Sequence, residues 1–139
     1  MDAIQLKLCD IQGRLFERAR TYESEGFIRA FMTSQTAAHL DSPYNKLLWM
    51  GEEYLLDELE EEKSLGTDGE KYSIDVLYWI GYIYRYWAIS RKESNRRIYR
   101  TAPAKAMKRN YAAFHTLPPE IAGQRRATSV SPKKQAVSH

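Results

Sequence analysis

The segment RNYAAFH, residues 109–115, carries the side chains best suited to proton-transfer chemistry. Histidine has an ordinary pKa close to neutrality, so His115 could move a proton at physiological pH. Arg109 could hold a phosphate through its planar guanidinium group. Asn110 could orient either group by hydrogen bonding. One hypothesis is therefore acid–base chemistry on a phosphate-containing substrate.

The same spacing resembles the Arg-x(4–6)-His motif of HEPN ribonucleases, which are all-α domains of about this size. The resemblance implies a metal-independent ribonuclease that uses Arg109, Asn110 and His115. Six residues turn a helix through about 240°, so the arginine and histidine converge only if the helix unwinds near its end. Pro118 and Pro119 indicate that the helix does end close by. Alternatively, His115 contacts the last helix carbonyls and Arg109 is a surface charge.

The segment YWIGYIYRYW, residues 78–87, holds six aromatic side chains and one arginine in ten positions. A membrane span is disfavoured because Asp75 and Arg85 interrupt the apolar run. A stacking platform for single-stranded nucleic acid would need exposed rings flanked by cations. A helix that is apolar nearly all round is normally central in its domain, and Gly81 would allow a neighbouring helix to approach closely.

We interpret this segment as a core helix with one exposed edge. Four side chains define the edge, since they cannot all face inward: Tyr82, Arg85, Tyr86 and Trp87, the last at its boundary. Tyr, Trp and Arg are enriched at the energetic centres of protein interfaces. The edge therefore predicts a docking face for a partner protein.

Other site chemistry has weaker support in the sequence. The acidic run contains Asp57, Glu58, Glu60, Glu61 and Glu62. It lacks the Glu-x-x-His motif of di-iron bundles, so we interpret it as a solvated helix end or a salt-sensitive docking patch. The single cysteine, Cys9, excludes an internal disulfide and a multi-thiolate zinc site, and its apolar surroundings indicate a buried residue. No phosphate-loop or dinucleotide motif is present, and we expect neither a cofactor nor a metal.

The charge is distributed unevenly along the chain. Residues 1–70 contain 7 Lys/Arg and 15 Asp/Glu, a balance of −8, whereas residues 71–139 contain 14 and 3, a balance of +11. The two halves could neutralise each other within one fold or join two copies head to tail as a homodimer. The basic half could also contact nucleic acid, which leaves a DNA-binding repressor as a further alternative. No helix-turn-helix pattern is recognisable.

Apolar residues recur at helical spacing through most of the chain, which is 43% hydrophobic and long enough to bury a core. We expect an all-α bundle of five or six helices over residues 1–122, with the aromatic helix at its centre. Its helices cover about 4–22, 26–40, 43–62 and 73–90, a short piece ending near 99, and 103–115. Ser42 with Pro43, and Ser73, are the expected helix starts. The composition of residues 123–139, rich in Ser, Lys and Arg, predicts a flexible basic tail. The start of the chain shows no signal-peptide pattern, so we expect a cytoplasmic protein.

Residues 25–122 resemble a family of small, uncharacterised bacterial helical proteins. The shared features are the paired SPYN and GEEYLL segments, the WIGYIYRYW helix, and AP followed by FHT. Members of that family are encoded beside toxin–antitoxin cassettes, some with toxins that resemble ADP-ribosyltransferases. The resemblance implies an antitoxin-like or accessory role. A non-enzymatic protein that binds and neutralises a toxin encoded nearby is therefore the leading hypothesis, ahead of the ribonuclease and the repressor.

Overall fold

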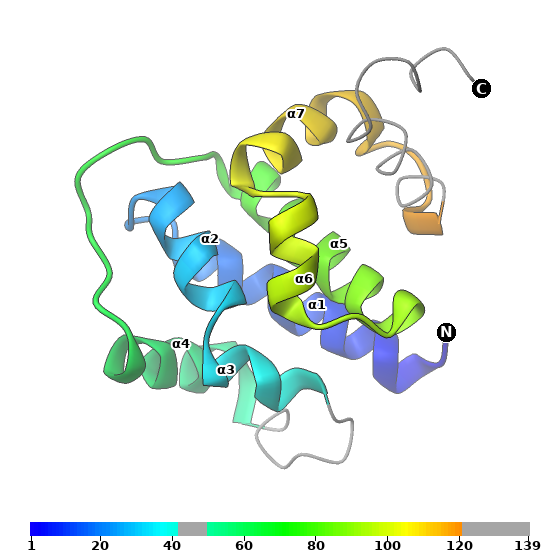
Figure 1. The fold of residues 1–139 in the computed structure, drawn as a ribbon, viewed down its shortest axis with the longest axis horizontal. Helices are drawn as coiled ribbons and strands as arrows, with labels where there is room; N and C mark the ends of the chain where they lie inside the picture. The colour runs from blue at the N-terminus through cyan, green and yellow to red at the C-terminus, as the bar shows by residue number, and fades with distance from the viewer. Residues whose placement is uncertain (42–49, 121–139) are drawn as a thin grey trace.

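The computed structural model describes residues 1–41 and 50–120. Within these ranges the chain forms seven α-helices, one 3-10 turn and no strand, which confirms the all-α class (Figure 1). In chain order the elements are α1 (Ala3–Arg18), α2 (Ser24–Met32), α3 (Gln35–Ala38), the 3-10 turn η1 (His39–Asp41), α4 (Gly51–Glu62), α5 (Ile74–Arg91), α6 (Asn95–Thr101) and α7 (Ala104–Phe114). The expected start at Ser42–Pro43 and the expected tail at 123–139 lie outside the described residues. None of the helices in the described ranges has both the length and the apolarity that a bilayer crossing requires.

Helix starts follow local side-chain chemistry. Asp2 and Gln5 form a reciprocal capping box at the start of α1, in which each side chain accepts the other residue's backbone N–H. The Ser73 hydroxyl accepts the backbone N–H of Val76 and caps α5, as expected from the sequence. Ser94 caps α6 in the same way. These caps satisfy amide groups that have no partner inside the helix.

Helices α1 and α5 pack closely against each other, and a glycine makes this possible. A Cβ atom built on Gly81 would lie only 2.6 Å from the backbone oxygen of Gln12, so the position admits no larger residue without movement. The Gln12 side chain uses this proximity and donates a hydrogen bond of 2.9 Å to the Gly81 carbonyl. The expectation that Gly81 allows close helix approach is confirmed.

The expected single helix over residues 26–40 is interrupted near its middle. Ser34 begins a separate short helix, α3, through a side-chain cap. The carboxylate of Glu62, at the end of α4, accepts the backbone N–H groups of Gln35 at 2.6 Å and Thr36 at 3.0 Å. A carboxylate from another helix therefore satisfies amides that a continuous helix would have paired internally.

A long connection, residues 63–73, joins α4 to α5 and runs along one side of the molecule (Figure 1). Most of it is exposed, as expected, but it is tied to the start of α2. The Ser24 backbone N–H donates to the Glu70 carbonyl at 2.9 Å, and the Ser24 hydroxyl accepts the Tyr72 N–H at 2.8 Å. The Tyr72 side chain is buried, which anchors the end of the connection in the core.

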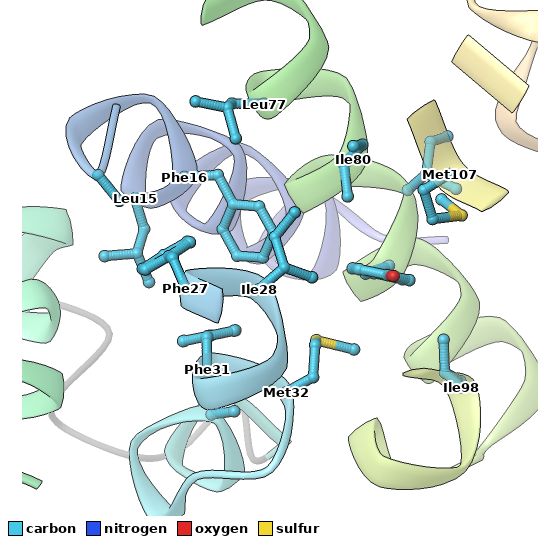
Figure 2. Close-up of a cluster of buried hydrophobic side chains, with 14 of the residues drawn as sticks. Leu15, Phe16, Phe27, Ile28, Phe31, Met32, Leu77, Ile80, Ile98 and Met107 are labelled. Atoms are coloured by element: carbon cyan, nitrogen blue, oxygen red, sulfur yellow. The ribbon is translucent and has the colours of Figure 1, made fainter. Parts of the chain in front are cut away.

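The core is built around aromatic rings from α1, α2 and α5 (Figure 2). The Phe16 ring contacts Phe27 and Phe31 edge-to-face, with centroid distances of 5.1 Å and 5.3 Å, and Tyr84 at 6.4 Å. Such arrangements stabilise aromatic pairs beyond the effect of burial alone. Ile98 and Met107 bring α6 and α7 to the same cluster, so α5 has the central position that its aromatic composition predicted.

Candidate functional site

Arg85 lies in the core and joins four other elements to α5. Its side chain is 1% exposed. The Nε atom donates to Gln12 Oε1 at 3.0 Å, and Nη1 donates to Asp41 Oδ1 at 2.7 Å. The Nη2 atom donates to the Ala37 carbonyl at 3.2 Å and to Asn95 Oδ1 at 3.1 Å. One guanidinium group therefore connects α1, α3, η1 and α6.

The expected exposure of Arg85 on a docking edge is wrong, and Trp87, which the sequence placed at the boundary of that edge, belongs to the core. Both side chains are buried, Trp87 at 1% exposure. Burial lowers the pKa of Arg85, while the hydrogen bond and the charge of Asp41 act in the opposite direction. A buried guanidinium is tolerated when it is hydrogen-bonded, and each of the three nitrogen atoms of this one donates to at least one acceptor. Arg85 is consequently part of the fold rather than a surface that a partner could contact.

The other two residues of the predicted edge remain accessible. Tyr82 and Tyr86 are half-buried, and Tyr78 precedes them at the same spacing of four residues, so the three define what we call the tyrosine row. The rings of Tyr78 and Tyr82 lie 6.0 Å apart. Residues spaced by four share one face of a helix, so the row is a continuous aromatic strip along α5.

Acidic side chains border the tyrosine row. The Tyr78 hydroxyl donates to the Asp10 carboxylate at 2.5 Å. Burial raises the pKa of Tyr82 and Tyr86, and the negative charge of Glu120 raises both further. The three hydroxyl groups therefore stay protonated at neutral pH and act as hydrogen-bond donors. Arg14 pairs with Asp10 at 2.9 Å, so Glu120 is the acid that leaves negative charge beside the row, while the expected positive charge of Arg85 is buried.

The candidate acid–base residue His115 packs against its own helix. It follows the last residue of α7 and keeps a helical backbone conformation, with φ −64° and ψ −19°. Its Nδ1 atom lies 2.6 Å from the Tyr111 carbonyl, and its ring stacks on the Tyr111 ring at 4.2 Å. This is the helix-end role that the sequence offered as the alternative to catalysis.

Arg109 and Asn110, the two residues proposed to act with His115, lie in different surroundings from it. Arg109 is exposed and lines a pocket of about 380 Å³ that His115 does not line. Asn110 is buried, and its amide group lies 3.9 Å from the Met107 sulfur. Because α7 stays regular through its last turn, the unwinding that would bring Arg109 and His115 together is not observed. The structure thus distributes the three residues over a pocket, the core and a helix end.

Two side chains of the acidic run on α4 hydrogen-bond to other parts of the fold. Glu62 caps α3, and Glu60 accepts the Tyr22 hydroxyl at 2.5 Å. No group of three or more His, Cys, Asp or Glu side chains in the described ranges is arranged to hold a metal ion. Cys9 is buried, and burial raises the pKa of its thiol to about 12, which disfavours the reactive thiolate.

Comparison of the chain with protein-family models, with curated proteins and with solved structures finds no match.

Sequence reasoning missed the residues that surround Arg85. Gln12, Asp41 and Asn95 lie 73, 44 and 10 positions away from it along the chain. Only Gln12 gave a local signal, because it is a polar residue at a position of α1 that the apolar spacing places on the core side. The acceptors for a buried arginine come from distant segments, so their grouping becomes visible only in the fold.

Proposed function

We propose that this chain is a non-enzymatic interaction protein whose docking site is the tyrosine row on α5. The observation that carries the proposal is the row itself: Tyr78, Tyr82 and Tyr86 stand half-exposed on one face of a helix that Arg85 fixes in the core. Tyrosine offers a large contact area with few rotatable bonds, so it loses little conformational entropy on binding. A rigid helix presents such side chains in a fixed arrangement.

The revised docking site differs from the edge predicted by the sequence. Tyr82 and Tyr86 are kept, Tyr78 is added, and the buried Arg85 and Trp87 are removed. Glu120 supplies negative charge beside the rings, whereas Asp10 is already paired with Arg14 at 2.9 Å. The complementary surface on a partner would combine apolar contacts with an arginine or lysine side chain that pairs with Glu120.

The resemblance of residues 25–122 to proteins encoded beside toxin–antitoxin cassettes supports a toxin as the partner. In that role the chain would act in the cytoplasm and inhibit by covering the active surface of the toxin. This mechanism needs no catalytic group on the inhibitor, which suits the separation of Arg109, Asn110 and His115. The toxin would be the product of a gene adjacent to that of this chain.

The proposal is tested by binding to the products of the neighbouring genes. The variants are Tyr82→Ala and Tyr86→Ala, and the matched control is Tyr54→Ala, a half-buried tyrosine on α4. Truncating an interface anchor costs about 2 kcal/mol or more, roughly a thirtyfold loss of affinity. We expect this loss for both row variants and unchanged affinity for the control. Circular dichroism confirms that each variant is folded at the temperature of the binding measurement.

Two results would contradict the proposal. If no neighbouring gene product binds the parent chain, the toxin assignment fails. If a product binds the parent chain, and both row variants bind it as tightly as the parent does, the docking site lies outside the tyrosine row. The acidic face of α4 is then the next surface to examine.

A further inference from the structure

Helices α6 and α7 carry a concentration of positive charge that the tyrosine row does not use. Between positions 91 and 109 the chain has eight Lys and Arg residues and a single acid, Glu93. Six of these cations are exposed on α6 and α7. We call them the basic surface: Arg96, Arg97, Arg100, Lys105, Lys108 and Arg109.

The helical repeat explains why these cations face outward. On α6, Asn95 and Ile98 are buried, and the three arginines fall within a sector of about 100° on the other side. On α7, Met107 and Asn110 are buried, and the three cations again occupy the opposite side. Each helix thus places its apolar face in the core and its charged face in solvent.

The two charged faces border the same neighbour, α2. Arg96 donates from Nη2 to the carbonyl of Thr33, at the C-terminal end of α2, at 2.7 Å. Lys105 and Arg109 line a pocket together with Glu25, near the N-terminal end of α2. Figure 1 shows α6 leading directly into α7 beside this helix. The basic surface therefore extends along one side of the molecule rather than being split between two sides.

Acidic side chains neutralise only part of this surface. Glu93 pairs with Arg97 at 3.6 Å, and Glu70 pairs with Lys108. Across residues 1–41 and 50–120, no ion pair engages the remaining four cations, which are Arg96, Arg100, Lys105 and Arg109. Helix α4 carries seven acids and no Lys or Arg, and it lies at the other end of the molecule from α7 (Figure 1). This separation of charge would orient the basic surface toward a polyanion.

We propose that the basic surface binds the phosphate backbone of nucleic acid. Arginine predominates on it, and the guanidinium fork matches the geometry of phosphate oxygens. The large hydrophobic side chains that are exposed in the described ranges lie on other elements: Met1, Ile4, Leu6, Met50 and Ile74. A protein interface usually has few charged side chains at its centre, whereas six cations stand together on this surface, so phosphate contacts fit it better than a protein does.

The test is the salt dependence of binding by the full-length chain. The probes are fluorescent DNA and RNA duplexes of mixed sequence, about two helical turns long, and single-stranded RNA of equal length. Four phosphate contacts predict a slope of about −3.6 in log affinity against log salt on duplex DNA, a loss on the order of a hundredfold between about 50 and 200 mM. Comparing the probes identifies which nucleic acid supplies the phosphates.

A triple variant isolates the basic surface from the rest of the chain. Residues 125, 126, 133 and 134 are also Lys or Arg and lie outside the described ranges, so the difference between variants is decisive. We expect Arg100→Gln, Lys105→Gln and Arg109→Gln together to make the slope less negative by about one unit per cation and to weaken binding at least about tenfold. The control removes the same charge elsewhere through Arg14→Gln, Arg20→Gln and Lys63→Gln, and it should keep most of the slope.

Three outcomes would overturn the proposal. The parent chain does not bind any probe at low salt. The triple variant and the control lose affinity equally, which would show an effect of net charge alone. Poly-glutamate, added at the same charge concentration, displaces the chain as well as unlabelled DNA does, which would favour an acidic protein as the partner. Thermal melting of each variant shows whether it is folded under the binding conditions.

Discussion

The Nη1 atom of Arg85 lies 2.7 Å from Oδ1 of Asp41, so a guanidinium that is 1% exposed is paired with a carboxylate that is 50% exposed. The pair connects the centre of α5 to η1 at the edge of the fold. Gln12 and Asn95 hold the same guanidinium from α1 and α6. Arg85 thereby adds polar contacts that fix the positions of α1, α3, η1 and α6 relative to α5.

Arg85→Ala should strongly destabilise the fold. The substitution opens a cavity and leaves the side-chain oxygens of Gln12 and Asn95 buried without the guanidinium that donates to them, and each buried polar group left unsatisfied costs about 1–3 kcal/mol. The control is Arg18→Ala, which removes an exposed arginine that pairs with Glu53 at 3.0 Å. An exposed pair contributes less than about 1 kcal/mol. Urea unfolding gives the loss of unfolding free energy in each variant relative to the parent chain. Similar losses in the two variants would contradict the structural role of Arg85.

Gly81→Ala should also destabilise the chain, although it adds only a methyl group. The added carbon would lie 2.6 Å from the Gln12 backbone oxygen and 2.9 Å from the Phe16 ring, so α1 and α5 must move apart. Overpacking of this kind costs about 1–3 kcal/mol. Gly66→Ala is the matched control, since no atom lies within 4 Å of its added carbon. If the two variants melt at the same temperature, the close approach of α1 and α5 is not a requirement of the fold.

The features that the sequence predicted correctly depend on neighbouring residues. The Ser73 cap, the burial of Cys9 and the glycine contact of α5 all follow from the pattern of a single helix and its ends. The interruption of the 26–40 stretch has one local signal, Ser34, whose side chain caps α3. Its other support is the Glu62 carboxylate, which is 27 positions away from the Gln35 amide that donates to it.

For the candidate docking site too, the sequence pattern predicted local features but not contacts between distant segments. Helical spacing correctly grouped Tyr82 and Tyr86 on one face, because this grouping follows from the period of the helix. It could not decide whether Arg85 is exposed, because arginine is normally a surface residue and its burial requires acceptors from other elements. The polar Gln12 in the apolar stripe of α1 was the single local hint of a buried polar network.

His115→Ala should not reduce any cleavage of RNA by the purified chain. The imidazole stacks on Tyr111 and contacts its carbonyl, and Arg109 lines a pocket that His115 does not reach. The measurement incubates total cellular RNA with the parent chain, with His115→Ala and with Arg109→Ala. His39→Ala controls for the loss of a histidine elsewhere. Cleavage that disappears in the first two variants and persists in the control would establish the ribonuclease instead.

Glu62→Ala should destabilise the chain in a manner that depends on pH. Burial tends to raise the pKa of Glu62, but hydrogen bonds from Gln35 and Thr36 outweigh it and lower the pKa below its ordinary value of 4.5. The folded state therefore favours the carboxylate. This contribution is fully present above the pKa of the unfolded chain and is lost as the pH falls through the lower pKa of the folded chain.

At neutral pH the loss should be about 1 kcal/mol, the usual value of a helix cap. As the pH falls through the lowered pKa of Glu62 in the folded chain, the carboxylate of the parent becomes protonated and its contribution is lost, so the melting temperatures of parent and variant should converge. Glu61→Ala serves as the control, because it removes a neighbouring exposed carboxylate that does not cap α3. Melting is followed by circular dichroism from neutral to acidic pH. A stability difference that stays constant across this range, or that appears equally in Glu61→Ala, would mean that the charge of Glu62 does not hold the start of α3.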